Sequence, residues 1–187
     1  MNANSLKNSL LISMPSLLEN KYKNSLIYLC HQGEYGSMGI ILNQKYNMDL
    51  STMLQHLDID SNAELYDQPV YCGGEIQSDR GFILHPYIPD HDWLSSYRVN
   101  DELSLTSSAD ILEAMAVGNG PEISHVSLGY IGWGPGELET EIIDNLWLNC
   151  PVNLDIIFTV AADDKLQAAA SLIGVNLDSL TSHSGKA

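Results

Sequence analysis

The sequence predicts an α+β protein with a mixed β-sheet and flanking helices. Helical and strand-like segments interleave irregularly along its 187 residues, without an internal repeat or a long polar linker. One pair of apolar runs predicts an antiparallel hairpin. Two further pairs of predicted strands are separated by a predicted helix, which is the connection that parallel strands require. The length and the apolar fraction of 44% allow a sizeable core. We therefore expect a single domain over residues 1–187, with a core at about 10–180 and a mobile tail at 181–187.

The N-terminal part predicts three strands. Residues 10–14 form an apolar run that Pro15 breaks, and no small-residue cleavage site follows. We therefore expect a strand there and not a signal peptide. Residues 25–30 and 38–42 are nearly continuous apolar runs on either side of the polar loop 31–37. This arrangement predicts a β-hairpin whose strands are covered on both faces.

A helix is predicted over residues 49–57, with Asp49 or Ser51 as its cap. The spacing of its apolar residues predicts one buried face, formed by Leu50, Met53, Leu54 and Leu57. After this helix we expect short strands at 70–72 and 82–84, and loops at 73–81 and 85–97.

The C-terminal half predicts three strands and three helices. A helix capped by Ser107 or Ser108 is expected to run through Val117 and to end at Gly118. Its apolar spacing predicts a buried face of Ile111, Leu112, Met115 and Ala116. The other strands are expected at 103–106, 126–131 and 155–160, and the other helices at 135–148 and 163–173. The last helix is expected to bury Leu166, Ala169, Ala170 and Ile173.

The charge balance is strongly acidic. The chain has 24 acidic and 8 basic residues, which gives a formal net charge of -16. Nucleic-acid binding requires lysines and arginines that displace counterions from phosphates, so direct DNA or RNA binding is disfavoured. Docking on anionic lipid is disfavoured for the same reason. This composition leaves a basic protein partner, a cation, a neutral ligand or simple solubility as explanations of the acidity.

The three cysteines predict reduced, buried thiols. Cys30, Cys72 and Cys150 are widely spaced, and each lies in an apolar, strand-like context. An odd number of such cysteines is typical of a cytosolic protein and not of a disulfide framework. No apolar stretch is long enough to span a membrane. We expect a cytoplasmic protein.

A glycine-rich turn at residues 129–136 precedes a predicted helix, which is where phosphate-binding loops occur. Its glycines do not have the order of a dinucleotide-binding or P-loop motif. Glu137 and Glu139 also place negative charge where a phosphate would bind. We interpret this segment as a structural turn whose helix end is neutralised by its own acids.

Two local patterns raise the question of metal binding or catalysis. His85 with Asp90, His91 and Asp92 combines imidazole and carboxylate groups, but the spacing matches no metal motif, and a solvated loop is favoured. Cys72 precedes two glycines, yet a buried strand thiol explains it better than a nucleophile does. No cofactor, metal or catalytic residue is predicted.

The segment from Gly73 to His85 is the most distinctive candidate for a binding site. Gly73 and Gly74 permit a close approach of backbone, and Asp79 and Arg80 offer groups for a ligand or for salt bridges within the loop. Structural pinning is favoured over ligand binding. If the chain has a site, the candidate residues are Gly73, Gly74, Asp79, Arg80, His85 and Trp133. Trp93, Trp133 and Trp147 would be interface anchors if exposed, and we expect them in the core.

The order of several motifs resembles the AlgH/YqgE family over about residues 10–180. The matching segments are 14–16, 39–43, 73–74 with 79–85, 128–139, and Asn145 with 147–148. The resemblance implies a bacterial cytosolic protein, with relatives in plant organelles, and a small, partly barrel-like mixed sheet flanked by helices. One member was named as a regulator of alginate production. The family has no established activity, cofactor or binding site, so it implies no site residues here.

The chain departs from the family pattern at two positions. The family commonly has a tryptophan where Leu166 stands, and its usual terminal Gly-His-Ala is replaced by a segment with Lys186. These departures weaken any role assigned to those positions.

The sequence supports three functional hypotheses. The first is a non-enzymatic interaction or regulatory protein that acts through an unknown protein partner, because the fold is sound, the charge is acidic and no catalytic motif is present. The second is a small-ligand binder or enzyme with a pocket near Gly73, Gly74, Asp79, Arg80 and His85. The third, a DNA-binding transcriptional regulator, follows only from the family's name and is disfavoured by the charge. The sequence predicts no oligomeric state.

Overall fold

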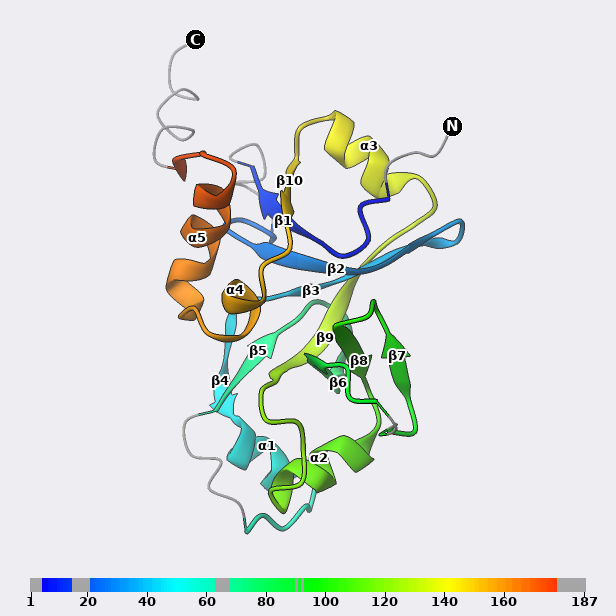
Figure 1. The fold of residues 1–187 in the computed structure, drawn as a ribbon, viewed down its shortest axis with the longest axis vertical. Coiled ribbons are helices and arrows are strands. Elements are labelled where there is room, and N and C mark those ends of the chain that lie inside the picture. The colour runs from blue at the N-terminus through cyan, green and yellow to red at the C-terminus, as the bar shows by residue number, and fades with distance from the viewer. Residues whose placement is uncertain (1–4, 15–20, 63–67, 90, 92, 178–187) are drawn as a thin grey trace. The chain divides into compact units, whose positions relative to one another are not determined.

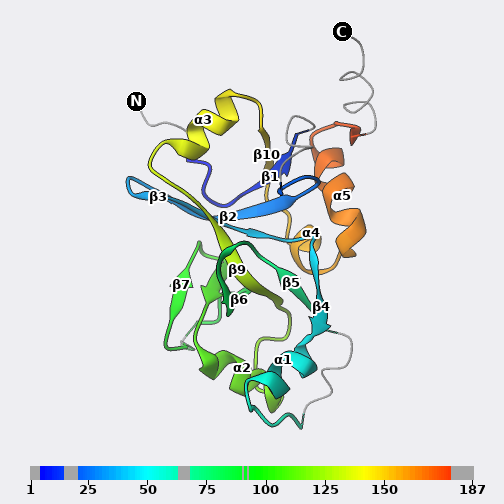
Figure 2. The same cartoon turned by 180° about the vertical axis from the view of Figure 1, so that it is seen from behind.

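The computed structural model describes residues 5–14, 21–62, 68–89, 91 and 93–177 (Figures 1 and 2). These residues form two compact units: unit 2 comprises the described residues of 44–130, and unit 1 those of 1–43 and 131–187. Both units combine strands with helices, and the sheet pairing is mixed, so the predicted α+β class is confirmed. The single domain stays a prediction, and the tail at 181–187 lies outside the described residues.

Unit 1 contains an antiparallel sheet in the order β10-β1-β2-β3-β9, to which β9 contributes Ile131–Trp133. Helix α5 packs against β1, β2 and β10 (Figure 1). The strands are β1 Ser9–Ser13, β2 Leu26–Gly33, β3 Gly36–Ile41, β9 His125–Trp133 and β10 Trp147–Pro151. The helices are α3 Glu137–Ile143, α4 Leu154–Phe158 and α5 Lys165–Leu172, with a 3-10 turn, η2, at Ala162–Asp164.

The predicted hairpin is formed by β2 and β3. The strands extend into the predicted loop and leave only Glu34 and Tyr35 as the turn. Gly36 follows with φ 123°, and a Cβ on it would lie 2.2 Å from the carbonyl oxygen of Trp133. Apolar side chains from several elements of this unit form its core: Leu11, Ile27, Leu29, Ile41, Ile131, Trp133, Leu138 and Trp147.

Unit 2 contains the first part of β9, which pairs in parallel with β5 and antiparallel with β6. β8 and β7 continue the sheet beyond β6, and β4 pairs with β5. Helices α1 and α2 lie side by side (Figures 1 and 2) and contribute most of the core. The strands are β4 Lys45–Asp49, β5 Pro69–Cys72, β6 Ile76–Pro86, β7 Ser96–Arg98 and β8 Leu103–Thr106, and the helices are α1 Leu50–His56 and α2 Ala109–Ala116.

Both helices of unit 2 begin and end close to the predicted residues. Asp49 caps α1: its Oδ1 accepts a hydrogen bond of 2.7 Å from the amide of Thr52, which lowers the pKa of this carboxyl. The predicted apolar faces are buried, apart from Leu57. This residue follows the end of α1 and is 48% exposed, so its predicted burial is wrong. In α2 the predicted face is buried as a whole: Ile111, Leu112, Met115 and Ala116.

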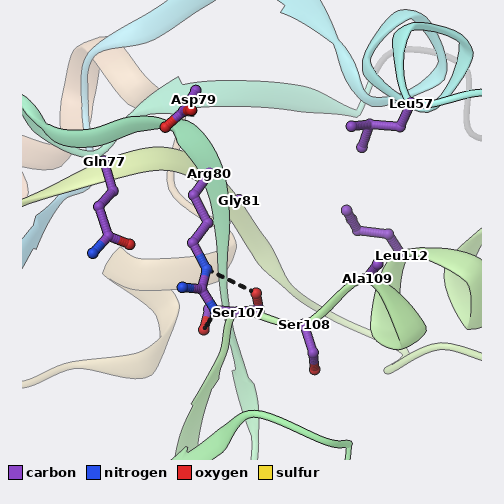
Figure 3. Close-up of a pocket in the computed structure, with 9 residues that line it drawn as sticks. All are labelled: Leu57, Gln77, Asp79, Arg80, Gly81, Ser107, Ser108, Ala109 and Leu112. Carbon is purple, nitrogen blue, oxygen red and sulfur yellow. Dashed lines mark hydrogen bonds between the residues drawn. The ribbon is translucent and has the colours of Figure 1, made fainter.

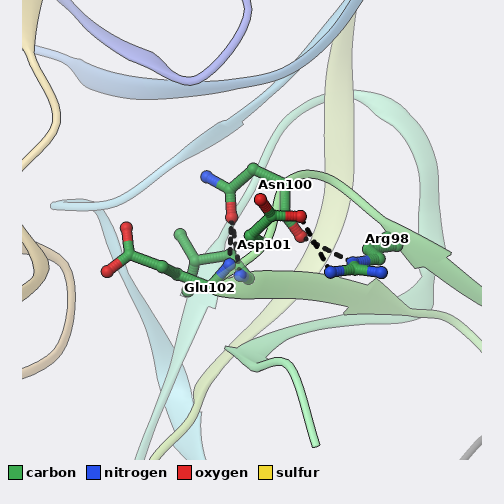
Figure 4. A network of polar contacts seen from close by, with 5 residues as sticks. Arg98, Asn100, Asp101 and Glu102 are labelled. Atoms are coloured by element: carbon green, nitrogen blue, oxygen red, sulfur yellow. Dashed lines mark hydrogen bonds and ion pairs between the residues drawn. The ribbon is translucent and has the colours of Figure 1, made fainter. Parts of the chain in front are cut away.

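The turn between β7 and β8 is held by a polar network (Figure 4). Oδ1 of Asn100 accepts hydrogen bonds of 2.7 Å from the amides of both Glu102 and Leu103. Arg98 pairs with Asp101 at 2.8 Å and donates through Nε to the carbonyl of Asn100. The charge of Arg98 is therefore neutralised inside the turn itself.

Further local predictions are wrong besides that for Leu57. The helix predicted at 135–148 ends at Ile143, because Asn145 adopts φ 56° and residues 147–151 form β10. The strand predicted at 155–160 is helix α4, which Asn153 caps by accepting from the amide of Ile156 at 3.1 Å. Most of the loop predicted at 73–81, together with the start of the one at 85–97, belongs to the eleven-residue strand β6. The final helix buries Ala169 and Ala170 as predicted, and Lys165 in addition, whereas Leu166 and Ile173 are only half-buried, so their predicted burial is wrong.

No helix in the described part of the chain combines the length and the apolar composition that crossing a membrane requires.

Candidate functional site

Strand β6 carries a wide bulge at the predicted candidate segment. Ile76 pairs with Tyr130 and Gly81 with Leu128, so residues 77–80 of β6 together face only Gly129 of β9. Gln77 within the bulge adopts a left-handed conformation, with φ 51°. Bulges of this kind bend a strand and redirect its side chains, and they are common beside functional sites.

The paired glycines allow the two backbones to meet beside this bulge. A Cβ on Gly73 would lie 2.4 Å from the carbonyl oxygen of Gly129, and a Cβ on Gly129 would lie 2.3 Å from the carbonyl oxygen of Gly74. Both distances are too short for any side chain. Gly73 therefore permits the close approach of the β5–β6 connection to β9, and neither Gly73 nor Gly74 lines a pocket next to the bulge.

The bulge forms one wall of a pocket of about 380 Å³, which we call the β6 pocket. This volume is within the range of small-molecule sites, roughly 300–1,000 Å³. Leu57 and Leu112 face one another at one end, whereas Gln77 and Arg80 extend from the bulge at the other (Figure 3). The lining residues are Leu57, Gln77, Asp79, Arg80, Gly81, Ser107, Ser108, Ala109 and Leu112.

The guanidinium group of Arg80 is oriented by one neighbouring residue. Its Nε donates to the carbonyl oxygen of Ser107 at 3.1 Å, and its Nη2 donates to the hydroxyl of Ser107 at 3.0 Å. The carboxylate of Asp79 points away from this guanidinium (Figure 3). Among the described residues, no carboxylate forms an ion pair with Arg80. The pocket thus presents a fixed cation together with hydroxyl and amide groups and an apolar end.

His85 lies in the interior of unit 2 and does not line the pocket. Its side chain is 2% exposed. Its Nδ1 donates to the carbonyl of Pro86 at 2.8 Å, and its Nε2 lies 2.9 Å from Oγ1 of Thr106. Burial lowers the pKa of this imidazole, and the bond to Pro86 opposes that shift only in part. A neutral histidine that satisfies both nitrogens internally has the geometry of a structural residue.

Trp133 is a core residue of unit 1. Its indole Nε1 donates to Oε2 of Glu141 at 2.8 Å, and Nε1 of Trp147 donates to the same oxygen at 2.6 Å. The two indole rings meet edge to face, with their centroids 6.1 Å apart. The expectation that Trp93, Trp133 and Trp147 are core residues is confirmed, since each is at most 6% exposed.

Of the six candidate residues, the structure places Asp79 and Arg80 in the pocket lining and Gly73 and Gly74 in the strand connection before it. The sequence interpretation missed Gln77, Leu112 and the pair Ser107–Ser108 as pocket residues. Ser107 and Ser108 were visible only as a helix cap. Their approach to Arg80 depends on β6 and β8 being neighbours, which local sequence does not encode.

The glycine-rich turn before α3 is structural, as predicted. Gly136 has φ 75° at the helix N-cap, and Oε2 of Glu137 accepts from the amide of Gly134 at 2.7 Å. Within the described ranges, no cluster of three histidine, cysteine or acidic side chains could hold a metal ion. The predicted cluster with His85 and His91 falls partly outside those ranges, because Asp90 and Asp92 are not described.

The three cysteines are free thiols. Cys30 and Cys150 are buried as predicted, and burial raises the pKa of both thiols. Cys72 is half-buried, so the prediction of burial is wrong for this residue.

Lys165 is a buried cation that the sequence interpretation missed. It is 1% exposed, and its Nζ donates to the carbonyl oxygens of Ile156, at 2.7 Å, and of Ile157. These are carbonyls of the short helix α4, so Lys165 joins α5 to α4. Burial lowers the pKa of its ammonium group to about 8.

Fold and pocket together define an α+β protein with a cavity of small-molecule size beside a bulged strand. The chain belongs to the AlgH-like family, whose model matches residues 10–178, and this confirms the resemblance identified in the sequence. A UPF0301 protein from Thioalkalivibrio sulfidiphilus is 46% identical over 180 residues, which are 96% of each chain. Another UPF0301 protein, from Nitrosococcus oceani, is 40% identical over 97% of this chain and 96% of its own.

Two solved structures have the same fold. The AlgH protein from Pseudomonas aeruginosa is 38% identical and superposes with a TM-score of 0.81 over 100% of this chain and 98% of its own. A protein from Corynebacterium diphtheriae is 16% identical, with a TM-score of 0.71 over 93% of this chain and 90% of its own. This second likeness shows the fold alone.

Proposed function

We propose that the chain is a non-enzymatic regulatory protein of the cytosol that binds a small ligand in the β6 pocket. The observation that carries this proposal is the pocket itself, with its volume of about 380 Å³ and its lining of polar groups at one end and leucines at the other. An apolar surface with a few converging polar groups is the usual composition of a small-molecule site. The free thiols support the cytosolic placement.

Thermal melting against a panel of metabolites, nucleotides and metal ions tests this proposal. A ligand that binds only the native state at about a hundred times its Kd stabilises it by roughly 2.7 kcal/mol, so a saturable rise in Tm is expected. Ala109→Leu places extra apolar atoms in the pocket and should abolish that rise. Ala161→Leu, the same substitution at an exposed position that does not line the pocket, should retain it. A rise that is equal in both variants would place the ligand elsewhere, and a flat panel would count against ligand binding.

A second candidate function is docking to a protein partner, through which a regulator of this kind would act. Three large apolar side chains are almost fully exposed: Tyr35 at 87%, Leu94 at 89% and Ile143 at 78%. Tyrosine is among the residue types that are enriched at the hot spots of protein interfaces, which favours Tyr35 as the anchor. A crosslinked pull-down with the wild type and with Tyr35→Ser, Leu94→Ser and Ile143→Ser tests this function. A partner that the wild type enriches and one of these variants loses would support it, and no enrichment over the control would contradict it.

A further inference from the structure

We infer that the β6 pocket selects a small organic anion, a carboxylate or phosphate ester whose charged group pairs with Arg80 and whose short apolar part packs against Leu57 and Leu112. This inference rests on the proposed function and names the chemical class of its ligand. It depends on three observations. Arg80 has hydrogen-bond donors that are not used within the described chain, its guanidinium has a fixed orientation, and one end of the pocket is polar while the other is apolar.

The guanidinium of Arg80 has donors to spare. An arginine carries five N–H donors, and the two bonds to Ser107 use Nε and one hydrogen of Nη2. Three donors are left, two of them on Nη1. Since no carboxylate within the described residues forms an ion pair with Arg80, these donors are open to an acceptor from outside the chain. Carboxylate and phosphate oxygens match the fork of a guanidinium better than neutral acceptors do.

Arg98 is the contrasting case, because its guanidinium is already paired with a carboxylate of the chain. It pairs with Asp101 at 2.8 Å, and the face of its guanidinium lies 4.1 Å from the ring centre of Tyr87. Arg80 also lies near a ring, 6.0 Å from the centre of Phe82, but no acidic residue in the described part of the chain pairs with it, although the sequence has three times as many acidic as basic residues. Acidic side chains are abundant in this protein. An oriented guanidinium that none of the described carboxylates pairs with therefore indicates an anion-binding position.

The orientation of Arg80 reduces the entropic cost of binding. A free arginine side chain loses rotamer freedom when it grips a ligand, whereas the two bonds to Ser107 have already fixed this one. Ser107 itself precedes helix α2, and its amide donates to the carbonyl oxygen of Ser95 at 3.0 Å. The residue that holds Arg80 is thus anchored in its turn.

The net charge of -16 opposes an anion only at long range. At physiological ionic strength the Debye length is about 8 Å, so most of the carboxylates are screened from the pocket. Contact with the exposed but oriented guanidinium of Arg80 acts at hydrogen-bond distance, well within the Debye length. The apolar end formed by Leu57 and Leu112 then favours an anion with a short hydrocarbon part over inorganic phosphate.

Titration of the full chain with four matched probes, followed by the NMR shifts of backbone amides, tests this class. The probes are pentanoate, butyl phosphate, pentanamide and pentylamine. We expect the two anions to shift the amides of Gly81, Ser107 and Ala109 in a saturable way, and the amide and amine probes to bind at least tenfold more weakly. Comparing the two anions with each other shows which head group the site prefers.

Three variants complete the test. Arg80→Gln should weaken both anions at least tenfold, Arg80→Lys should recover part of that loss, and the matched control Arg98→Gln should bind like the wild type. If pentanamide and pentanoate bind equally, or if Arg80→Gln binds the anions like the wild type, the inference that the ligand is an anion is wrong. The proposal that the pocket binds a ligand is not contradicted by either result. If no probe shifts these amides, the inference falls, and the proposed function falls with it only if the wider melting panel is also flat.

Discussion

At the scale of single residues, Glu141 organises the core of unit 1. One carboxylate oxygen accepts from the indole nitrogens of both Trp133 and Trp147. The half-buried carboxylate of Glu141 therefore fixes the orientation of both indole rings. Hydrogen bonds to a charged group contribute more than neutral ones, about 1.5–3 kcal/mol each, and a buried donor without an acceptor is costly.

Replacing Glu141 by alanine should therefore lower the free energy of unfolding by about 2–4 kcal/mol. Glu141→Gln should cost less, because its amide oxygen still accepts from both indoles. Urea unfolding followed by tryptophan fluorescence measures both effects. Glu122→Ala, at an exposed position, is the control and should lie within about 0.5 kcal/mol of the wild type. If Glu141→Ala behaves like this control, the double acceptor has no stabilising role.

Gly73→Ala tests the close approach of backbone beside the pocket. The new Cβ would lie 2.4 Å from the carbonyl oxygen of Gly129, so the strands must move apart. We expect a loss of roughly 1–3 kcal/mol in the free energy of unfolding, measured by chemical denaturation. Gly134→Ala is the matched control, since its Cβ would meet its nearest neighbour, an oxygen of Glu137, at 3.5 Å. Equal stability of the two variants would show that β5 and β9 tolerate a wider separation.

At the scale of secondary-structure elements, Lys165 links α5 to the carbonyls of α4. Its pKa is about 8 in the folded chain and about 10.4 in an unfolded one. The unfolded state therefore holds more protons between these values, so the stability contributed by this group rises with pH across that window. Below pH 8 the Lys165 ammonium group is charged in the folded state as well, so its full desolvation free energy lowers the stability of the fold.

The difference in unfolding free energy between the wild type and Lys165→Met isolates this effect. We expect the difference to move in favour of the wild type between pH 7.5 and 10, by on the order of 3 kcal/mol at most. The raised thiol pKa values of Cys30 and Cys150 act in the opposite direction, because those thiols ionise more readily once unfolded. Both proteins contain these thiols, so their contribution cancels. Parallel pH profiles for the two proteins would contradict the buried-cation interpretation.

Some helices and strands could be predicted from local sequence alone. The hairpin and helices α1 and α2 were predicted because their apolar patterns agree with the fold, and because Asp49 and Ser108 occupy the N-cap positions, although Ser108 makes no side-chain capping bond. Helix α4 was not, because Ile156, Ile157 and Phe158 favour strands locally while the cap at Asn153 and the bonds from Lys165 favour a helix. Tertiary contacts decided between these two preferences.

The pocket was predictable only in part for the same reason. Asp79 and Arg80 were identified as candidates from residue type and from the adjacent glycines. The bulge that presents them depends on pairing with Gly129, about fifty residues away in the sequence. The residue that orients Arg80, Ser107, lies in yet another segment, the connection between β8 and α2. Local patterns can name a candidate side chain, but its hydrogen-bond partners come from long-range pairing.

At the scale of the whole molecule, the dominant property is the net charge of -16. A field of this sign repels polyanions at long range, and the effect strengthens as salt is removed. A small anion that contacts one arginine differs from a nucleic acid, which needs several cations arranged along its backbone. The basic residues of this chain are few, and Arg98 is occupied by Asp101. The proposed anion site at Arg80 and the predicted absence of DNA binding are therefore compatible.

We accordingly expect no retention of duplex DNA at the lowest salt at which the protein stays soluble. A protein that neutralises several phosphates binds more tightly as salt falls, with a slope close to the number of phosphates contacted. Fluorescence anisotropy of a labelled duplex, titrated at about 20 mM and 200 mM NaCl, measures this directly. Binding that appears at low salt and weakens with such a slope would reinstate a direct regulator of transcription. A flat titration at both salt concentrations would leave ligand binding and protein docking as the two functions to separate, and Ala109→Leu distinguishes them because only ligand binding requires an open β6 pocket.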